Sequence, residues 1–444
     1  MFYLNKDTIL TPGLINKMIN KFTQGTQPKL DKWKNYYDGR HVILNKAYKD
    51  ASKECNHIVT NYCKIITDTY SGYICGKPVS YSSNQPIEDI QDVINYNDSD
   101  AEDMIFCTNA LIYGIAYELH WIDKFAQPRY SQISPTNCFA VWDNTLDCEL
   151  LYFIRWYKID TFDESNLYKI EVYSANTITT YEAQGLGGEL TFISEEPHYF
   201  GMVPVSVFRL NDSETNIFDA IISLNDAYNE LQSSEIDDFN AWVDSYLLLA
   251  GVDAEADDIA QMKENRVLIL PMDATAQWLT KNANDTQIVN ILQNIKENIF
   301  KVTACPDMAD ESFLAQSGTA LSYKLVGFEN VASGIVAQFT KALQKRIELI
   351  CSILNIKASD AAWRDININF VRNLPVNLTE IIQIINALKG TVSDATLLGQ
   401  IPFITDVQSE LEAVNKQKEE QMALYGFGIG DDTEDEDDTE DDVA

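Results

Sequence analysis

The sequence predicts an α+β fold whose mixed body carries a long helical excursion that leaves the body and returns to it. Three observations predict this class. First, over residues 1–216 the spacing of apolar residues is three to four in some segments and two in others, which indicates helices and strands. Second, two amphipathic helices flank a short β-rich stretch. Third, another long helix follows. With 444 residues and 45% apolar side chains, the chain is long enough for two or three units with real cores.

The first 216 residues combine helical and alternating patterns. Thr11-Pro12 and Pro28 each open a helix, and Leu30, Trp33 and Tyr37 share one helical face. Three more helical patterns cover 56–71, 87–95 and 100–113. Alternation of apolar and polar residues then predicts strands at 117–121, 137–142, 151–157, 169–173, 177–181 and 205–210, with a hairpin turn at Gly185–Gly188.

The stretch Asn61–Tyr81 indicates a helix running into Gly72, a corner at Gly76-Lys77-Pro78 and a short strand. Gly76-Lys77 looks briefly like a phosphate-binding loop. That motif needs a glycine five residues before its second glycine and Ser or Thr after the lysine, where this chain has Ser71 and Pro78. A structural corner is therefore the favoured interpretation.

From Ile217 the pattern is helical for about 25 residues, roughly 37 Å of helix. Its apolar face is formed by Ile217, Ala220, Ile221, Leu224, Ala227, Tyr228 and Leu231. Residues 241–285 hold short apolar runs typical of a small β-rich module, and a second amphipathic helix covers 286–302. A loop at 303–317 follows. Residues 318–376 contain a long helix, with Gly327 and Gly334 inside it, and a strand near Ile368. The chain ends in a helical unit at 377–427 and a tail at 428–444.

The formal net charge is −34, and Asp431–Asp442 contributes ten acidic residues to it. The tail is expected to be disordered, because highly charged sequence cannot bury apolar surface. The acidic body argues against a protein that grips duplex DNA through many Lys and Arg contacts, although DNA that passes without being gripped stays compatible with it. No secretory signal and no run of about 18 apolar residues is present, so neither secretion nor a membrane span is expected.

Eight cysteines are spread singly, which indicates reduced thiols in a cytosolic protein. Cys55 and His57 could share a metal, but structural zinc wants four ligands, and no metal or cofactor is expected. H-E-x-x-H, G-x-S-x-G and a Walker loop are absent, which leaves no catalytic residue to assign.

Several motifs follow one another in an order and spacing that resemble the portal proteins of tailed bacteriophages, in the SPP1-type branch. They are Tyr36–His41, Asn56–Asn61 with Gly72–Val79, Gly114–Glu118, Ser134–Asn137, Gly201–Val205, Leu224–Asn229, Pro306–Met308 with Phe313, and Ser317–Leu321. Relatives often place Gly-Asn before the Ser-Gly pair, where this chain has Ala315-Gln316.

The resemblance implies a portal fold and a ring of, normally, twelve copies at one capsid vertex of the virion, assembled in the host cytoplasm. Its parts would be an α/β wing (1–216), two stem helices (217–240 and 286–302), a small β-rich clip (241–285), a tunnel loop (303–317), a long kinked helix with a wing strand (318–376) and a helical crown (377–427). Double-stranded DNA would be the passing cargo. The protein partners would be terminase, a head-completion adaptor, scaffold and major capsid proteins, with no membrane involved.

The resemblance also suggests which residues face DNA. The tunnel-loop candidates are Pro306, Asp307, Met308, Asp310, Glu311 and Phe313; a packed connector is the alternative for this loop. The channel-lining candidates on the stem are Asp226, Glu230, Glu235, Lys296 and Lys301, with Asp219, Asp237 and Asp238 as further acidic positions. A negative channel wall would repel the phosphates of DNA and reduce its binding to the wall. The alternative is that these acidic residues only form an ordinary solvated helix face.

Two rival interpretations remain open at this stage. One is a hydrolase with an acidic cleft, and the other is a different virion structural protein, such as an adaptor or capsid subunit. The helix–β–helix excursion favours the portal over the latter.

Overall fold

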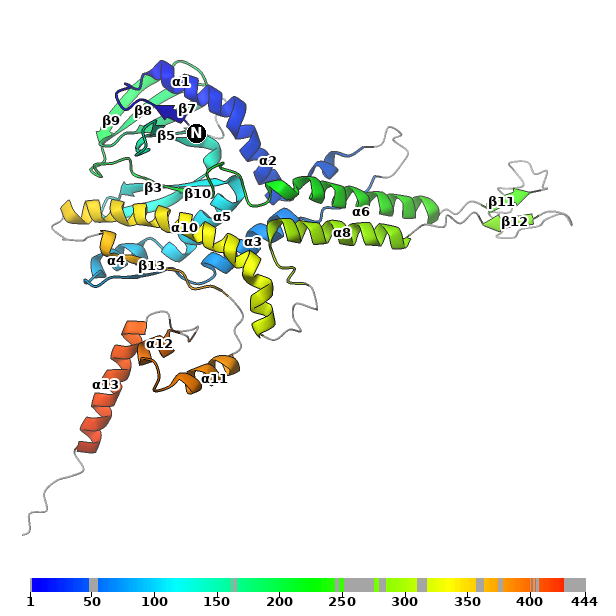
Figure 1. The fold of residues 1–444 in the computed structure, drawn as a ribbon. Coiled ribbons are helices and arrows are strands. Elements are labelled where there is room, and N and C mark those ends of the chain that lie inside the picture. Colours follow the sequence, from blue (N-terminus) through cyan, green and yellow to red (C-terminus); the bar gives the residue numbers. More distant parts are fainter. Residues whose placement is uncertain are drawn as a thin grey trace, which may run out of the picture.

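The computed structural model describes residues 2–47, 55–160, 162, 166–243, 247–250, 275–278, 285–309, 318–356, 363–373, 378–399, 401, 404 and 407–426. Figure 1 shows a mixed body from which two helices project side by side, with a pair of short antiparallel strands beyond their ends. The expected α+β class is confirmed, since helices and antiparallel sheets both contribute to the body.

The N-terminal helices begin where the sequence predicts. The Thr11 side chain accepts a hydrogen bond from the Leu14 amide and caps α1 (Pro12–Lys21), which runs through a π turn (Phe22–Thr26) into α2 (Gln27–Tyr37). Leu30 and Trp33 are buried as expected, but the third buried residue is Tyr36. Tyr37 instead donates its hydroxyl proton to Asp68 at the surface.

One six-stranded sheet has the order β1-β5-β6-β7-β8-β9. β1 runs parallel to β5, and all other neighbours are antiparallel. Gly185 and Gly187 have φ of 76° and 91° in the predicted turn between β8 and β9, which glycine adopts without steric cost. The strands are β1 (Phe2–Leu4), β5 (Cys138–Asp143), β6 (Leu150–Lys158), β7 (Leu167–Tyr173), β8 (Thr177–Gln184) and β9 (Thr191–Pro197), of which β1 and β9 were not predicted.

A three-stranded antiparallel sheet has the order β10-β3-β4, with β10 at Val205–Arg209, β3 at Ile115–Ile122 and β4 at Pro128–Ile133. Helix α5 (Ser99–Tyr113) leads into β3 through Gly114, which has φ of 74°. A Cβ atom at Gly114 would lie 2.4 Å from the carbonyl oxygen of Glu214, so only glycine fits this junction.

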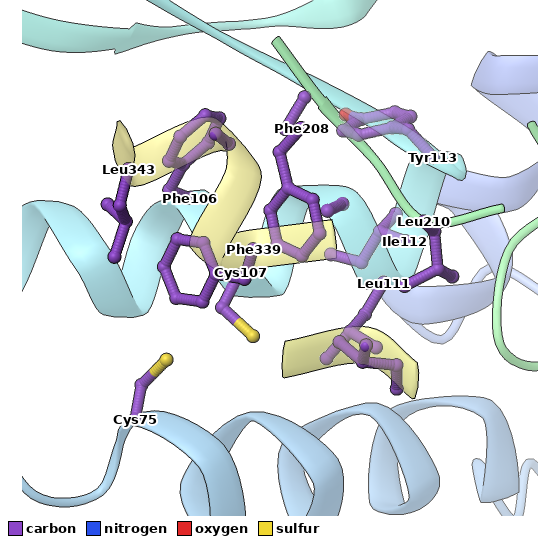
Figure 2. Packing of buried hydrophobic residues seen from close by; sticks show 14 of the residues in the cluster. Cys75, Phe106, Cys107, Leu111, Ile112, Tyr113, Phe208, Leu210, Phe339 and Leu343 are labelled. Carbon is purple, nitrogen blue, oxygen red and sulfur yellow. The ribbon is translucent and has the colours of Figure 1, made fainter. Parts of the chain in front are cut away.

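The long helix α10 (Gly318–Ile356) packs against β10, and its Phe339 and Arg346 contact Phe106 and Asp103 of α5. Figure 2 shows the rings of Phe106, Phe208 and Phe339 at this junction, and those of Phe208 and Phe339 stack with centroids 4.8 Å apart. The sulfurs of Cys75 and Cys107 point toward each other nearby. Figure 1 shows that the first part of α10 is set at an angle to the rest.

The helical prediction for 56–71 is wrong over its first six residues, because helix α3 begins at Tyr62 and ends at Cys75. The Asn61 side chain accepts a hydrogen bond from the Lys64 amide and caps the helix. Gly72 lies within α3, and the corner at Gly76–Pro78 then leads to β2 (Ser80–Ser82), which pairs with β13 (Asn367–Asn369). Helix α4 (Glu88–Tyr96) follows β2.

The projecting pair consists of α6 (Ile222–Val243) and α8 (Asp285–Thr303), and strands β11 (Leu247–Ala250) and β12 (Thr275–Trp278) form a two-stranded antiparallel sheet beyond it. Helix α6 begins five residues later than expected, because Asp219–Ile221 form a 3-10 turn. The apolar run expected at 267–270 lies outside the described residues.

The C-terminal part contains α11 (Leu378–Leu388), α12 (Asp394–Leu398) and α13 (Val407–Gly426), while the acidic tail lies outside the described residues. Short 3-10 turns occur at Val42–Asn45, Pro135–Asn137 and Trp363–Asp365. Within the described residues, no helix has the length and apolar character that crossing a bilayer requires.

Candidate functional site: the projecting helix pair and the loop after it

The base of the helix pair is fixed to the body by aromatic side chains. The Tyr62 ring at the start of α3 makes edge contacts with Tyr228 of α6 and Phe300 of α8, with ring centroids 5.2 and 5.8 Å apart. Ile299 of α8 is fully buried beside them. Such edge-to-face contacts fix the direction in which the pair leaves the body.

Three of the acidic side chains considered as channel lining make contacts within the subunit. Asp219 accepts a hydrogen bond from the Trp33 indole at 2.7 Å, Asp226 accepts one from the Tyr36 hydroxyl at 2.8 Å, and Asp237 accepts two from Asn56. Burial and the Asp226 carboxylate raise the pKa of Tyr36. These contacts give Asp226 a role in docking α6 on α2, whereas Glu230 is exposed and Glu235 is half-buried.

The two lysines of α8 have different surroundings. The Lys296 ammonium lies 2.7 Å from an Asp307 carboxylate oxygen, so this pair joins α8 to the loop that follows it. Lys301 is exposed and lies 3.3 Å from Glu297 one turn earlier on the same helix. An exposed pair of this kind contributes little to stability, so Lys301 stays available to other anions.

The loop after α8 starts from a fixed point. The Thr303 carbonyl accepts a hydrogen bond from the buried Tyr70 hydroxyl at 2.7 Å, and the next residue, Ala304, turns the chain with φ of 53°. Pro306 and Asp307 are partly buried, whereas the Met308 side chain is 47% exposed. Asp310, Glu311 and Phe313 lie outside the described residues.

An extended segment, residues 55–61, runs along α6 and was not predicted from the sequence. Backbone N–H groups at every second residue of this segment and at Tyr62 donate to short polar side chains at every fourth residue of α6. The pairs are Asn56 to Asp237, Ile58 to Ser233, Thr60 to Asn229 and Tyr62 to Asn225, at 2.7, 3.0, 2.9 and 3.1 Å. We call this set of contacts the polar seam.

The polar seam matches two periodicities. Alternate residues of an extended segment face the same way, and residues four apart lie on one helix face. The backbone N–H groups of the segment therefore meet the polar side chains of α6. The stripe Asn225, Asn229, Ser233 and Asp237 was visible in the sequence as four short polar residues at four-residue steps. It could have indicated a helix face built to bind backbone.

Arg346 of α10 is completely buried in the body between two acidic side chains. Its Nε and Nη2 atoms donate to the two carboxylate oxygens of Glu118 at 2.9 and 2.6 Å, and its Nη1 lies 2.5 Å from Asp103. Burial alone would raise the pKa of Glu118, but Arg346 and the hydrogen bonds to the carboxylate lower it to about 2. This cluster fastens α10 to α5 and β3.

The same cluster contains a histidine and a serine, which raises the hydrolase hypothesis. His120 Nε2 lies 2.9 Å from Ser206 Oγ and 3.2 Å from Glu118. A catalytic triad needs the serine and the carboxylate on different ring nitrogens, whereas both lie at Nε2 here. All three residues are also buried, so the arrangement is a structural hydrogen-bond network.

The other three histidines are held by backbone carbonyls: His41 by Tyr36, His57 by Lys46 and His198 by Ser174. Cys55 also points to the Lys46 carbonyl, so the pair considered for a metal shares a backbone contact instead. Over the part of the chain that the structure describes, no group of three potential ligands is arranged to hold a metal ion.

Comparison with known proteins identifies the family of the chain. The family model of the phage portal protein, SPP1 Gp6-like, matches residues 18–423. The chain belongs to this family. Among curated proteins, the portal protein of Bacillus phage SPP1 is 21% identical over 434 residues, which cover 93% of this chain and 85% of that protein. The resemblance found from the sequence motifs is confirmed, and the match includes all of them.

Proposed function

We propose that this protein is the portal, or head–tail connector, of a tailed phage. Copies of the chain form a ring at one capsid vertex, and double-stranded DNA passes through that ring during packaging and ejection. The observation that carries the proposal is the helix pair α6 and α8. The two helices project from the body side by side, with the β11–β12 strand pair beyond them. Copies arranged with these pairs around an axis enclose a tube.

In this ring α6 and α8 are the stem, and their exposed charges are the channel-lining candidates. Each acidic residue on the inward side is repeated once per copy, so Glu230 and Glu235 would build negative rings that repel phosphates. Lys301 would add a basic ring that touches phosphates transiently. Asp226 and Lys296 serve the subunit itself, through Tyr36 and Asp307.

We assign the tunnel loop to residues 303–317. Its first part supports this assignment, because Tyr70 and Lys296 fix the chain up to Asp307 while Met308 is exposed. Asp310, Glu311 and Phe313 remain candidates on sequence grounds. A fixed base with exposed residues beyond it suits a loop that contacts moving DNA.

The partners follow from the ring. The copy number is twelve, the clip around β11 and β12 docks terminase and later the head-completion adaptor, and scaffold and major capsid proteins surround the ring in the virion. The protein is not an enzyme, because terminase supplies the energy for packaging. Purified protein should therefore hydrolyse no ATP above a buffer control.

Light scattering after size exclusion and end-on negative-stain images test the proposal. The expected particle is many times heavier than one 50.2 kDa chain and has a central hole. A stable monomer, or closed shells and filaments, would contradict it.

A further inference from the structure

The two N-terminal helices carry an unusual concentration of positive charge. Residues 12–46 contain seven Lys and Arg against two acidic residues, in a chain of net charge −34. The apolar residues of α1 and α2, such as Ile15, Ile19 and Leu30, are buried in the body. The exposed basic side chains are Lys17, Lys21, Lys29, Lys32 and Arg40, and we call this surface the basic face.

A second surface has the opposite composition. Residues 78–123 contain nine acidic residues and no Lys or Arg. Asp103 and Glu118 are buried against Arg346, but the acidic side chains of α4 and of the start of α5 are exposed. They are Glu88, Asp89, Asp92, Asp98 and Asp100, and we call this surface the acidic face.

The two faces lie on opposite sides of the body. In Figure 1, α1 and α2 lie above the long helix α10, and α4 lies below it. A ring is built from heterologous contacts, in which one patch of a subunit meets a different patch of the next. Complementary patches on opposite sides meet this requirement, whereas a two-fold contact would place each face against its own charge.

We propose that the basic face of one copy docks on the acidic face of the next copy around the ring. The proposal rests on the ring function proposed above. It explains how subunits of charge −34 associate although their overall charges repel one another. Nucleic acid is the less favoured occupant, since DNA binding would account for the basic face alone and leave its acidic counterpart without a role.

Two double variants test the contact. Lys17→Glu with Lys32→Glu lowers the charge of the five basic-face side chains from +5 to +1, and Asp92→Lys with Asp100→Lys changes that of the five acidic-face side chains from −5 to −1. Each change removes most of the attraction across the contact, so each variant alone should assemble at least about ten-fold more weakly than wild type at about 0.1 M salt. Light scattering measures assembly, and thermal unfolding of the separated subunits establishes that both variants fold.

An equimolar mixture of the two variants is the decisive measurement. In alternating subunits, every second contact joins two unchanged faces, and the other contacts join the introduced glutamates to the introduced lysines. The mixture should therefore restore rings of alternating subunits. Glu195→Lys with Glu196→Lys on exposed β9 changes the net charge as much as the acidic-face variant does, and it should leave assembly unaffected.

Three results would overturn the proposal. The first is that both variants assemble like wild type, and the second is that the mixture of folded variants forms no rings. The third is that the basic-face variant keeps its rings but loses binding to a short DNA duplex, which makes nucleic acid the occupant. If wild type itself forms no ring, the proposed function fails as well, and this result is distinct from the other three.

Discussion

At the scale of single residues, the cluster of Arg346, Glu118 and Asp103 places three charged side chains in the interior of the body. A buried ion pair is costly to form but much more costly to break, because removing one partner leaves an uncompensated charge. Here one guanidinium serves two carboxylates that belong to α5 and β3. Loss of Arg346 therefore affects three elements at once.

Replacing Arg346 with Met should lower the free energy of unfolding of the isolated subunit by about 3–5 kcal/mol, since Asp103 and Glu118 lose their shared partner. The neighbouring Lys345 is the matched control. It is partly exposed and paired with Glu348, so Lys345→Met should cost less than about 1 kcal/mol. Urea unfolding followed by circular dichroism measures both, and equal losses would show that burial of the charge is not the cause.

Asp103 also gives the subunit a defined pH dependence. Burial raises its pKa to about 6 despite Arg346, so the folded state takes up this proton at a higher pH than the unfolded chain does. The contribution of Asp103 to stability therefore increases as the pH falls from about 6.5 toward 4. Burial lowers the pKa of nearby His120, whose effect has the opposite sign in this range.

The variant Asp103→Asn lacks this titration but keeps His120. The difference in unfolding free energy between wild type and variant should therefore shift in favour of wild type between pH 6.5 and pH 4.5. Urea titrations at the two pH values measure it. A difference that stays constant, or shifts toward the variant, would mean that Asp103 is already ionised in the folded protein at pH 4.5.

At the scale of elements, the polar seam holds the extended segment 55–61 on the projecting helix α6. Its four donors are backbone groups, and the side chains of Asn56 and Thr60 add hydrogen bonds to Asp237 and Gln232. The contact therefore depends mainly on which amides face the helix. The amide of Ile58 donates to Ser233, whereas the amide of Val59 donates to none of the four seam residues.

Proline substitutions at Ile58 and Val59 show whether the segment is held by its backbone amides or by its side chains. Ile58→Pro removes a seam hydrogen bond and leaves the Ser233 hydroxyl without its donor, which should cost about 1–3 kcal/mol. Val59→Pro keeps the seam and should cost clearly less, since proline suits extended backbone. Thermal unfolding compares them. A larger loss for Val59→Pro would mean that the segment is held by its side chains instead.

How far the sequence predicted each element depended on how local its determinants are. The Thr11 cap, two of the three residues of the α2 face (Leu30 and Trp33) and the β8–β9 turn were predicted, because a few neighbouring residues determine them. The start of α3 was missed. The segment before it contains Ile58 and Val59, which fit a helical pattern, and its actual partners lie on α6 more than 160 residues away.

The same reason explains the outcome for the candidate site. Helix periodicity identified the α6 and α8 excursion, but it could not show which acidic residues face the body. Asp226 and Glu230 have the same charge and lie one helical turn apart on α6. They differ because the Tyr36 hydroxyl of α2 donates a hydrogen bond to Asp226. Strands β1, β4 and β9 were missed. Strand β1 has only three residues, and β9 is exposed along almost its whole length, so neither shows the alternation of buried and exposed side chains that predicts a strand.

At the scale of the whole molecule, positive and negative charges are concentrated in different regions of the chain. The basic face, the acidic face and the run Asp431–Asp442 are separate in sequence. Only the first two belong to helices that pack on the body. The acidic run contains no apolar residue that could join a core.

Truncation before residue 428 should therefore leave the ring and the thermal stability of the subunit unchanged. Light scattering of the truncated and full-length proteins, under the same salt conditions, measures this. Folded subunits that no longer assemble would show that the tail takes part in ring formation.

The polar seam has one more consequence, which follows from its geometry. Four helical residues advance about 6.0 Å along the axis of α6, whereas two extended residues advance about 6.6 Å. The two rows slip past each other by about 0.6 Å at every step, and over three steps the offset approaches 2 Å, more than the distance range of a good hydrogen bond. A straight helix can therefore guide a strand for only about four pairs, so a longer strap along α6 would require the helix to curve.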